Sequence, residues 1–151
     1  MRHFAWDPAL ETGCVDIDDQ HRGLFDLANA LESAIDARAG GHADEEAVAN
    51  AVYGLVDYVV EHFEDEQHLM DRYRYPGRGP HRALHEQLSA ETLGILARYT
   101  NGEELAPSEL APLVCGWLTG HVAQHDRSVV AFVERIDARL KAVPDPVAAP
   151  Q

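Results

Sequence analysis

The stretch HFEDEQHLMDRYRYPGRGPHRALH, at residues 62–85, contains two pairs of possible metal ligands on either side of a Pro/Gly-rich break. His62 and Glu66 are four residues apart before the break. His81 and His85 have the same spacing after it. Residues four apart lie on one face of a helix, so each pair can present two ligands to a common point. Because the break is short, the two helices can run antiparallel, and we predict a metal site between them.

Apolar residues recur with a helical period through four segments, and no segment shows the alternation of a half-buried strand. The segments cover about 18–38, 44–74, 80–99 and 108–141. The start of the fourth is left open, because Pro112 would lie one turn inside a helix capped by Ser108. Glycine- and proline-rich turns separate the segments. Short connections make neighbouring helices antiparallel, so we predict an all-α, up-down-up-down four-helix bundle.

The bundle is expected to lie between two less regular ends. We predict an irregular N-terminal arm at 1–17, the bundle at 18–141, and a mobile Pro/Ala-rich tail at 142–151. In the arm, Phe4 and Trp6 are apolar anchors. Asp16 or Asp18 can cap the first helix by accepting from its free N–H groups.

Acidic residues outnumber basic ones by 26 to 12, which gives a formal net charge of −14. This charge repels phosphate backbones, so a nucleic-acid partner is not expected. No stretch has the length of a membrane span, and the first residues lack the apolar core of a signal peptide. We therefore expect a cytoplasmic protein in which Cys14 and Cys115 stay reduced.

Histidine is abundant, with nine residues in the chain. Candidate metal ligands occur on every predicted helix: His21; His62 and Glu66; His81 and His85; and His121, His125 or Asp126. Imidazole and carboxylate ligands without a thiolate motif suit iron, manganese or zinc. Burying this many histidines without partners would cost several kcal/mol, which favours ligands over passive core residues.

The residues of these motifs and their order along the chain resemble those of the bacterial hemerythrins (bacteriohemerythrins), a family of oxygen-binding di-iron proteins. The matching pieces are DDQH ending at His21, HFEDE at 62–66, PHRALH at 80–85 and WLTGHVAQHD at 117–126. Trp6 in the arm also fits. The resemblance spans residues 6 to about 135, which is nearly the whole chain.

The resemblance implies a ligand set of seven residues around two non-haem iron ions joined by a bridging oxo or hydroxo group. His81, His85 and His121 would hold one iron, His21 and His62 the other, while Glu66 and Asp126 would bridge both. The iron with two histidines would keep one position open for dioxygen. The resemblance also implies an apolar pocket wall, for which plain core packing is an equal alternative: Leu24, Phe63, Trp117, Leu118 and Val122.

Spacing and resemblance give different residues for the ligand after His121. On a regular helix, His125 lies about 40° from His121, whereas Asp126 lies about 140° away. Spacing therefore favours His125, but the resemblance favours Asp126, which we adopt, with His125 outside the ligand set. His3, His42 and His68 are interpreted as core or boundary residues rather than ligands.

Reversible dioxygen binding for storage, delivery or sensing is the leading functional hypothesis. A di-iron peroxidase, a nitric-oxide or peroxide reductase, and an iron buffer are the alternatives. The predicted pocket is apolar and offers no general acid or base, which favours binding over catalysis. A ferritin-like centre is not supported, because no histidine here follows a glutamate by three residues. A sensor would need a separate partner protein for its output.

Overall fold

The computed structural model describes residues 3–38 and 40–142, and all regular structure within these ranges is helical. The first half contains a short helix η1 (Pro8–Leu10), α1 (Val15–Asp36), α2 (His42–Asp57), η2 (Tyr58–His62) and α3 (Phe63–Arg72). The second half contains α4 (Arg78–Thr100), α5 (Pro107–Gly116), η3 (Trp117–Asp126) and α6 (Arg127–Ala142). The residues that join α2, η2 and α3 all have helical backbone angles, and so do those joining α5, η3 and α6.

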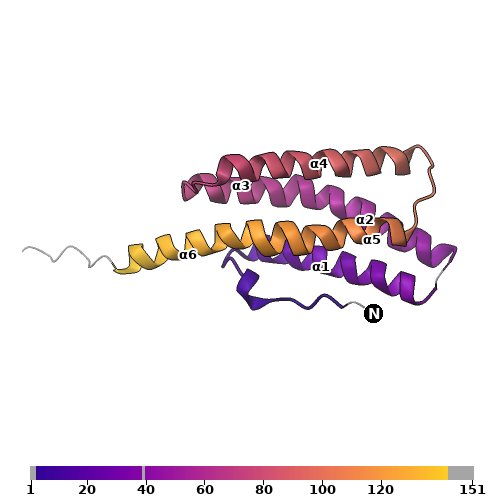
Figure 1. The fold of residues 1–151 in the computed structure, drawn as a ribbon, viewed down its shortest axis with the longest axis horizontal. Helices are drawn as coiled ribbons and strands as arrows, with labels where there is room; N and C mark the ends of the chain where they lie inside the picture. The colour runs from indigo at the N-terminus through magenta and orange to yellow at the C-terminus, as the bar shows by residue number, and fades with distance from the viewer. Residues whose placement is uncertain (1–2, 39, 143–151) are drawn as a thin grey trace, which may run out of the picture.

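These segments form four rods: α1, α2–η2–α3, α4 and α5–η3–α6 (Figure 1). Consecutive rods run in opposite directions, and α1 packs against both α2 and α5 while α2 packs against α4. The predicted all-α four-helix bundle is therefore confirmed. No helix in the described part of the chain is both long and apolar enough to cross a membrane.

Two of the rods contain a π-helical segment in the middle, which the period of the sequence did not predict. In an α-helix the backbone bonds join residues i and i+4, whereas a π-helix joins i and i+5. Segment η2 covers residues 58–62 and η3 covers 117–126. Such segments are rare and often occur at functional sites, because the extra residue changes which side chains share a face.

The N-terminal arm is held against the bundle by specific contacts. The backbone N–H of Phe4 donates to the Asn29 side chain (2.8 Å), which donates in return to the Phe4 carbonyl (3.0 Å). Trp6 packs edge-on against Phe25, with 5.6 Å between ring centroids. Asp7 forms an ion pair with Arg127 of α6.

The start of one helix differs from the prediction, and the start of another, which the sequence left open, is decided by the structure. Helix α1 begins at Val15, so Asp18 lies inside the helix and accepts from the backbone N–H and hydroxyl of Thr12 rather than capping it. Helix α5 begins at Pro107, with Pro112 inside it and no side-chain cap from Ser108. Proline is favoured in the first turn because its missing N–H has no helical partner there. The predicted tail at 142–151 lies outside the described residues except for Ala142.

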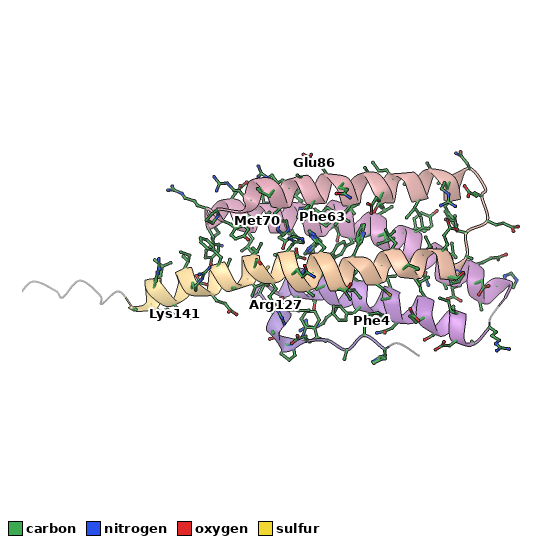
Figure 2. The ribbon with its side chains drawn as sticks, viewed as in Figure 1. Phe4, Phe63, Met70, Glu86, Arg127 and Lys141 are labelled. Carbon is green, nitrogen blue, oxygen red and sulfur yellow. The ribbon has the colours of Figure 1, made fainter. Side chains whose placement is uncertain are left out.

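The bundle has two hydrophobic clusters with a layer of buried polar side chains between them. The larger cluster includes Phe63 and extends toward the α1–α2 connection, and the smaller one is formed by Met70, Val129 and Val133 (Figure 2). Along α2–η2–α3, His62 and Glu66 occupy the positions that separate the two clusters. The polar layer is therefore the part of the interior that hydrophobic packing does not explain.

Candidate metal centre

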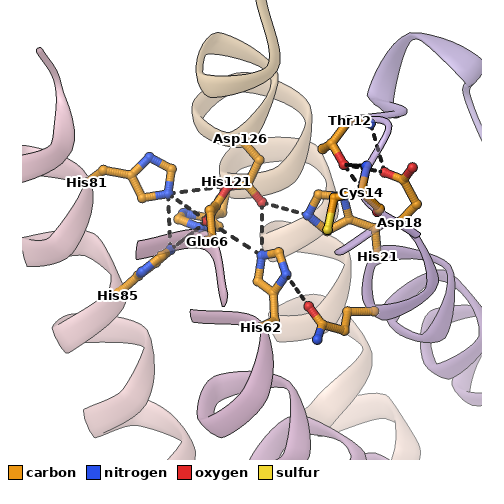
Figure 3. Close-up of polar contacts among 11 residues, drawn as sticks. Thr12, Cys14, Asp18, His21, His62, Glu66, His81, His85, His121 and Asp126 are labelled. Carbon is orange, nitrogen blue, oxygen red and sulfur yellow. Dashed lines mark hydrogen bonds and ion pairs between the residues drawn. The ribbon is translucent and has the colours of Figure 1, made fainter. Parts of the chain in front are cut away.

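All seven predicted ligands lie in this polar layer, and all are at least 95% buried. They come from all four rods: His21 from α1, His62 and Glu66 from η2 and α3, His81 and His85 from α4, and His121 and Asp126 from η3 (Figure 3). Their side chains point toward one another across the bundle axis (Figure 3). By contrast, His3, His42, His68 and His125 are exposed and belong to neither group of possible ligands, although the His125 ring lies 5.8 Å from that of His121.

The π-helical segment η3 explains why Asp126, and not His125, faces the centre. Because π-helical bonds join i and i+5, residues five apart share a face in such a segment. His121 Nε2 accordingly lies 3.0 Å from Asp126 Oδ1, while His125 is exposed. The spacing argument for His125 was wrong because it assumed a regular α-helix.

Five of the residues form the first group of possible ligands: Glu66, His81, His85, His121 and Asp126. His85 Nε2 lies 3.0 Å from His81 Nε2 and 3.1 Å from His121 Nε2. Glu66 Oε2 lies 3.0 Å from both His81 and His85. Atoms at adjacent corners of an octahedron with metal–nitrogen bonds of about 2.1 Å lie about 3 Å apart, so three imidazoles at these distances fit one ion.

His21, His62 and Asp126 form the second group. Asp126 Oδ2 lies 3.1 Å from His21 Nε2 and 3.5 Å from His62 Nε2. His62 Nε2 is also 3.5 Å from Glu66 Oε2. The carboxylates of Asp126 and Glu66 therefore lie between the two sets of histidines, and each can contact both.

Three buried atoms of the ligand residues lack the hydrogen bonds that buried polar atoms normally make. Within residues 3–38 and 40–142, these are His62 Nε2, Asp126 Oδ1 and His21 Nδ1, and of the three, His62 Nε2 and Asp126 Oδ1 face the other ligands. Asp126 Oδ1 is only 3.0 Å from His121 Nε2, but the angles at these atoms do not suit a hydrogen bond. Atoms that converge without bonding to each other fit ligands aimed at a common ion, so the residues present fit a metal.

The electrostatics of the cluster favour charged carboxylates. Burial and the Asp126 charge act to raise the pKa of Glu66, but close contacts with His62, His81 and His85 hold it well below the usual value of 4.5. Burial acts to lower the pKa of His62 and of His81. The close negative charges of the Asp126 and Glu66 carboxylates outweigh this effect and raise both to about 9. Two protonated histidines thus balance the two carboxylates when no metal is present.

Glutamine side chains contact the outer nitrogens of two histidines, a role that we did not predict from the sequence. Gln20 Oε1 lies 3.1 Å from His62 Nδ1, and Gln20 Nε2 donates to Asp65 (2.8 Å). The side-chain amide of Gln67 contacts His85 Nδ1 at 3.3 Å. A partner on Nδ1 fixes the ring so that Nε2 faces a metal. The positions of Gln20 and Gln67, each next to a predicted ligand, were the available signal.

The five residues predicted for the apolar pocket all lie buried in the larger hydrophobic cluster: Leu24, Phe63, Trp117, Leu118 and Val122. The Phe63 ring stacks on His85 with 3.9 Å between centroids. Tyr58, which the prediction missed, stacks in the same way on His62 at 4.4 Å. Burial, with the negative charges of Asp126 and Glu66, raises the pKa of Tyr58 well above its usual value of 10. Its position four residues before His62 places it on the ligand face, and this spacing could have revealed it.

Comparison with known proteins identifies the family. The family model for the hemerythrin HHE cation-binding domain matches residues 12–133. The chain is 32% identical over 140 residues to a bacteriohemerythrin from Pseudomonas paraeruginosa, covering 93% of this chain and 88% of the relative. A bacteriohemerythrin from Stenotrophomonas maltophilia is 28% identical over 93% of this chain and 86% of its own length. A hemerythrin-like protein from Naegleria gruberi is 25% identical over 82% of this chain and 87% of its own. With this match and a buried cluster of histidines and carboxylates at its centre, the chain belongs to the hemerythrin family.

Proposed function

We propose that the buried cluster holds two non-haem iron ions with a bridging oxo or hydroxo group, and that it binds dioxygen reversibly. The role would be oxygen storage, delivery or sensing. The observation that supports this proposal most strongly is the pair of ligand groups that share Asp126 but contain unequal numbers of histidines. An oxygen-binding centre needs one metal with a free coordination position, and the smaller group supplies fewer ligands.

In this proposal each ligand has one role. His81, His85 and His121 hold the first iron, and His21 and His62 hold the second. Glu66 and Asp126 bridge the two, as their contacts with both sets of histidines support. The open position belongs to the iron that has two histidines.

Ferrous iron, when bound, supplies the electrons that reversible dioxygen binding requires, and the surrounding side chains keep water away from it. Leu24, Phe63 and Trp117 are each at most 3% exposed, as are Leu118 and Val122. An apolar wall of this kind admits a small neutral molecule but disfavours water and ions. The apolar wall therefore slows irreversible oxidation to a ferric protein that no longer carries oxygen.

The test is oxygenation of the iron-loaded protein. The purified chain would be loaded with ferrous iron without oxygen, exposed to air and then deoxygenated over several cycles, while its visible spectrum is recorded. We expect about two bound irons per chain and an absorption band that appears and disappears with each cycle. Immediate irreversible oxidation, or turnover of added peroxide or nitric oxide at the rate of an enzyme, would contradict the proposal.

A further inference from the structure

Tyr58 is a buried polar side chain beside the metal centre for which the ligand set gives no use. The residue is 5% exposed, and within residues 3–38 and 40–142 its hydroxyl has no hydrogen-bond partner. Buried hydroxyls in proteins almost always have such a partner. The hydroxyl of Tyr58 is therefore available to a partner from outside the described residues.

The Tyr58 ring packs against His62, a histidine of the smaller ligand group. Its ring lies nearly parallel to that of His62, at an interplanar angle of 18°. Tyr58 and His62 leave the same helical rod one turn apart, and both are buried. Because the phenol is longer than the imidazole, it reaches at least as far into the bundle as the His62 ring, which Figure 3 shows. The Tyr58 ring also packs against two apolar rings, with 5.5 Å between its centroid and that of Phe63 and 6.0 Å between its centroid and that of Trp117.

We propose that Tyr58 recognises the ligand of this centre by donating a hydrogen bond from its hydroxyl to a small molecule that enters the pocket beside His62. This inference rests on the proposed function, because it assumes a ligand position on the His21–His62 side. Among the described tyrosines, Tyr58 is the one whose ring packs against Phe63 and Trp117 of this apolar wall. It favours ligands that carry a terminal oxygen or nitrogen acceptor with negative charge, such as azide or dioxygen once it has gained electron density.

The hydrogen bond would add selectivity that an apolar wall alone cannot provide. A purely hydrophobic pocket distinguishes small molecules by size and polarity only. A buried donor that is satisfied only when an acceptor arrives strengthens binding of that acceptor and disfavours ligands without one. Tyr58 is therefore a specificity-determining residue, whereas the metal ligands determine that binding occurs at all.

The test uses azide as the probe and Tyr58→Phe as the variant, which keeps the stacked ring and removes only the hydroxyl. Iron-loaded, fully oxidised protein would be titrated with azide, followed by its absorption. We expect the azide dissociation constant to rise about tenfold, because one ordinary hydrogen bond changes affinity by about this factor. The infrared stretch of bound azide should shift between H2O and D2O in the unmodified protein and lose that shift in Tyr58→Phe. Tyr53→Phe is the matched control, because Tyr53 is 53% exposed and packs against Tyr99 away from the centre.

The outcomes separate this inference from the proposed function. If the unmodified protein does not load iron or bind azide, the proposed function fails. If it does both, but Tyr58→Phe has unchanged azide affinity and D2O shift, the inference alone is overturned. A change in Trp117→Phe with none in Tyr58→Phe would overturn it too, because the Trp117 indole N–H is also buried without a partner among the described residues. Loss of iron from Tyr58→Phe would also overturn the inference, because it would show that the phenol holds His62 in position.

Discussion

Among single residues, Asp126 connects the two halves of the centre, because its two carboxylate oxygens face different histidines. Oδ1 lies 3.0 Å from His121 and Oδ2 lies 3.1 Å from His21. We expect Asp126→Ala to abolish loading of the iron pair, since both groups lose a ligand at once. His125→Ala should load as the unmodified chain does, because His125 is exposed. Iron per chain, measured by elemental analysis, checks both variants, and the reverse result would return the ligand role to His125.

Gln20 allows a test of how the ligands are positioned. Its amide oxygen accepts from His62 Nδ1, and its amide nitrogen is held by Asp65. Removing such a partner typically lowers metal affinity by roughly 10- to 100-fold, so we expect a loss of this size in Gln20→Ala. Competition with a ferrous chelator without oxygen measures it. Gln87→Ala on the exposed face of α4 is the control, and equal affinities in the two variants would show that Gln20 has no positioning role.

The sequence predicted residues of this site where a ligand type and a motif coincide. All seven candidate ligands meet in the structure, although six of them could be found by helical spacing or by an apolar face, and Asp126 only by resemblance. Tyr58 and Gln20 were not predicted. Spacing places Tyr58 on the ligand face and Gln20 next to His21, but it does not tell which atom of a neighbouring ring each side chain contacts.

At the scale of helices, periodicity predicted the rods but not the π-helical segments within them. Segments η2 and η3 lie inside long apolar runs, and a single extra residue changes the period too little to be recognised there. The geometry of the centre is the physical reason for them: η2 ends at His62, and η3 contains both His121 and Asp126. A π-helical backbone is less favourable than an α-helical one, so it occurs where the placement of ligands outweighs that cost.

The turn between α3 and α4 offers a prediction about stability. Arg74 has a positive φ of 52°, and the bonds from Arg74 N–H to Asp71 and from Tyr75 N–H to Met70 form a Schellman helix end. Non-glycine residues adopt this conformation at a cost of about 1–2 kcal/mol. Arg74→Gly should therefore raise the free energy of unfolding by roughly 1 kcal/mol, measured by urea denaturation of the metal-free protein.

Arg72→Gly is the matched control for this turn. Arg72 is the last residue of α3 and has ordinary helical geometry, so glycine there should destabilise the protein by up to about 1 kcal/mol. The same substitution is thus expected to have opposite signs two residues apart. Changes of the same sign would show that the strain at Arg74 is not the cause.

At the scale of the whole molecule, the bundle buries a charged layer, and its stability without metal should depend on pH. His62 and His81 have folded pKa values of about 9 against 6.5, so their stabilising effect is complete below pH 6.5 and is lost as pH rises through about 9. The pKa values of Glu66 and Asp126 are lowered from 4.5 and 3.8, so their effect is lost as pH falls below this range. Burial lowers the pKa of His85, which acts in the opposite sense and moves the optimum toward pH 6.5. Urea unfolding of the metal-free chain should therefore show a maximum between about pH 4.5 and 6.5, and a maximum near pH 9 would contradict these assignments.

Metal loading should show the opposite dependence on pH from that of the metal-free fold. A ligand nitrogen must be unprotonated to bind a metal, so an ion can enter only as His62 and His81 lose the protons that balance Glu66 and Asp126. Between pH 6.5 and about 9 we expect affinity to rise steeply with pH, approaching about 100-fold per unit if both protons are released together. Redox-inert zinc can report this without oxidation, through chelator competition and proton uptake by an indicator dye. Because the exposed His125 and His68 are outside the cluster, their replacement by Ala should leave the number of released protons unchanged. If affinity were flat over this range, His62 and His81 would already be neutral in the metal-free protein, and the charge balance of the buried layer would have to come from protonated carboxylates instead.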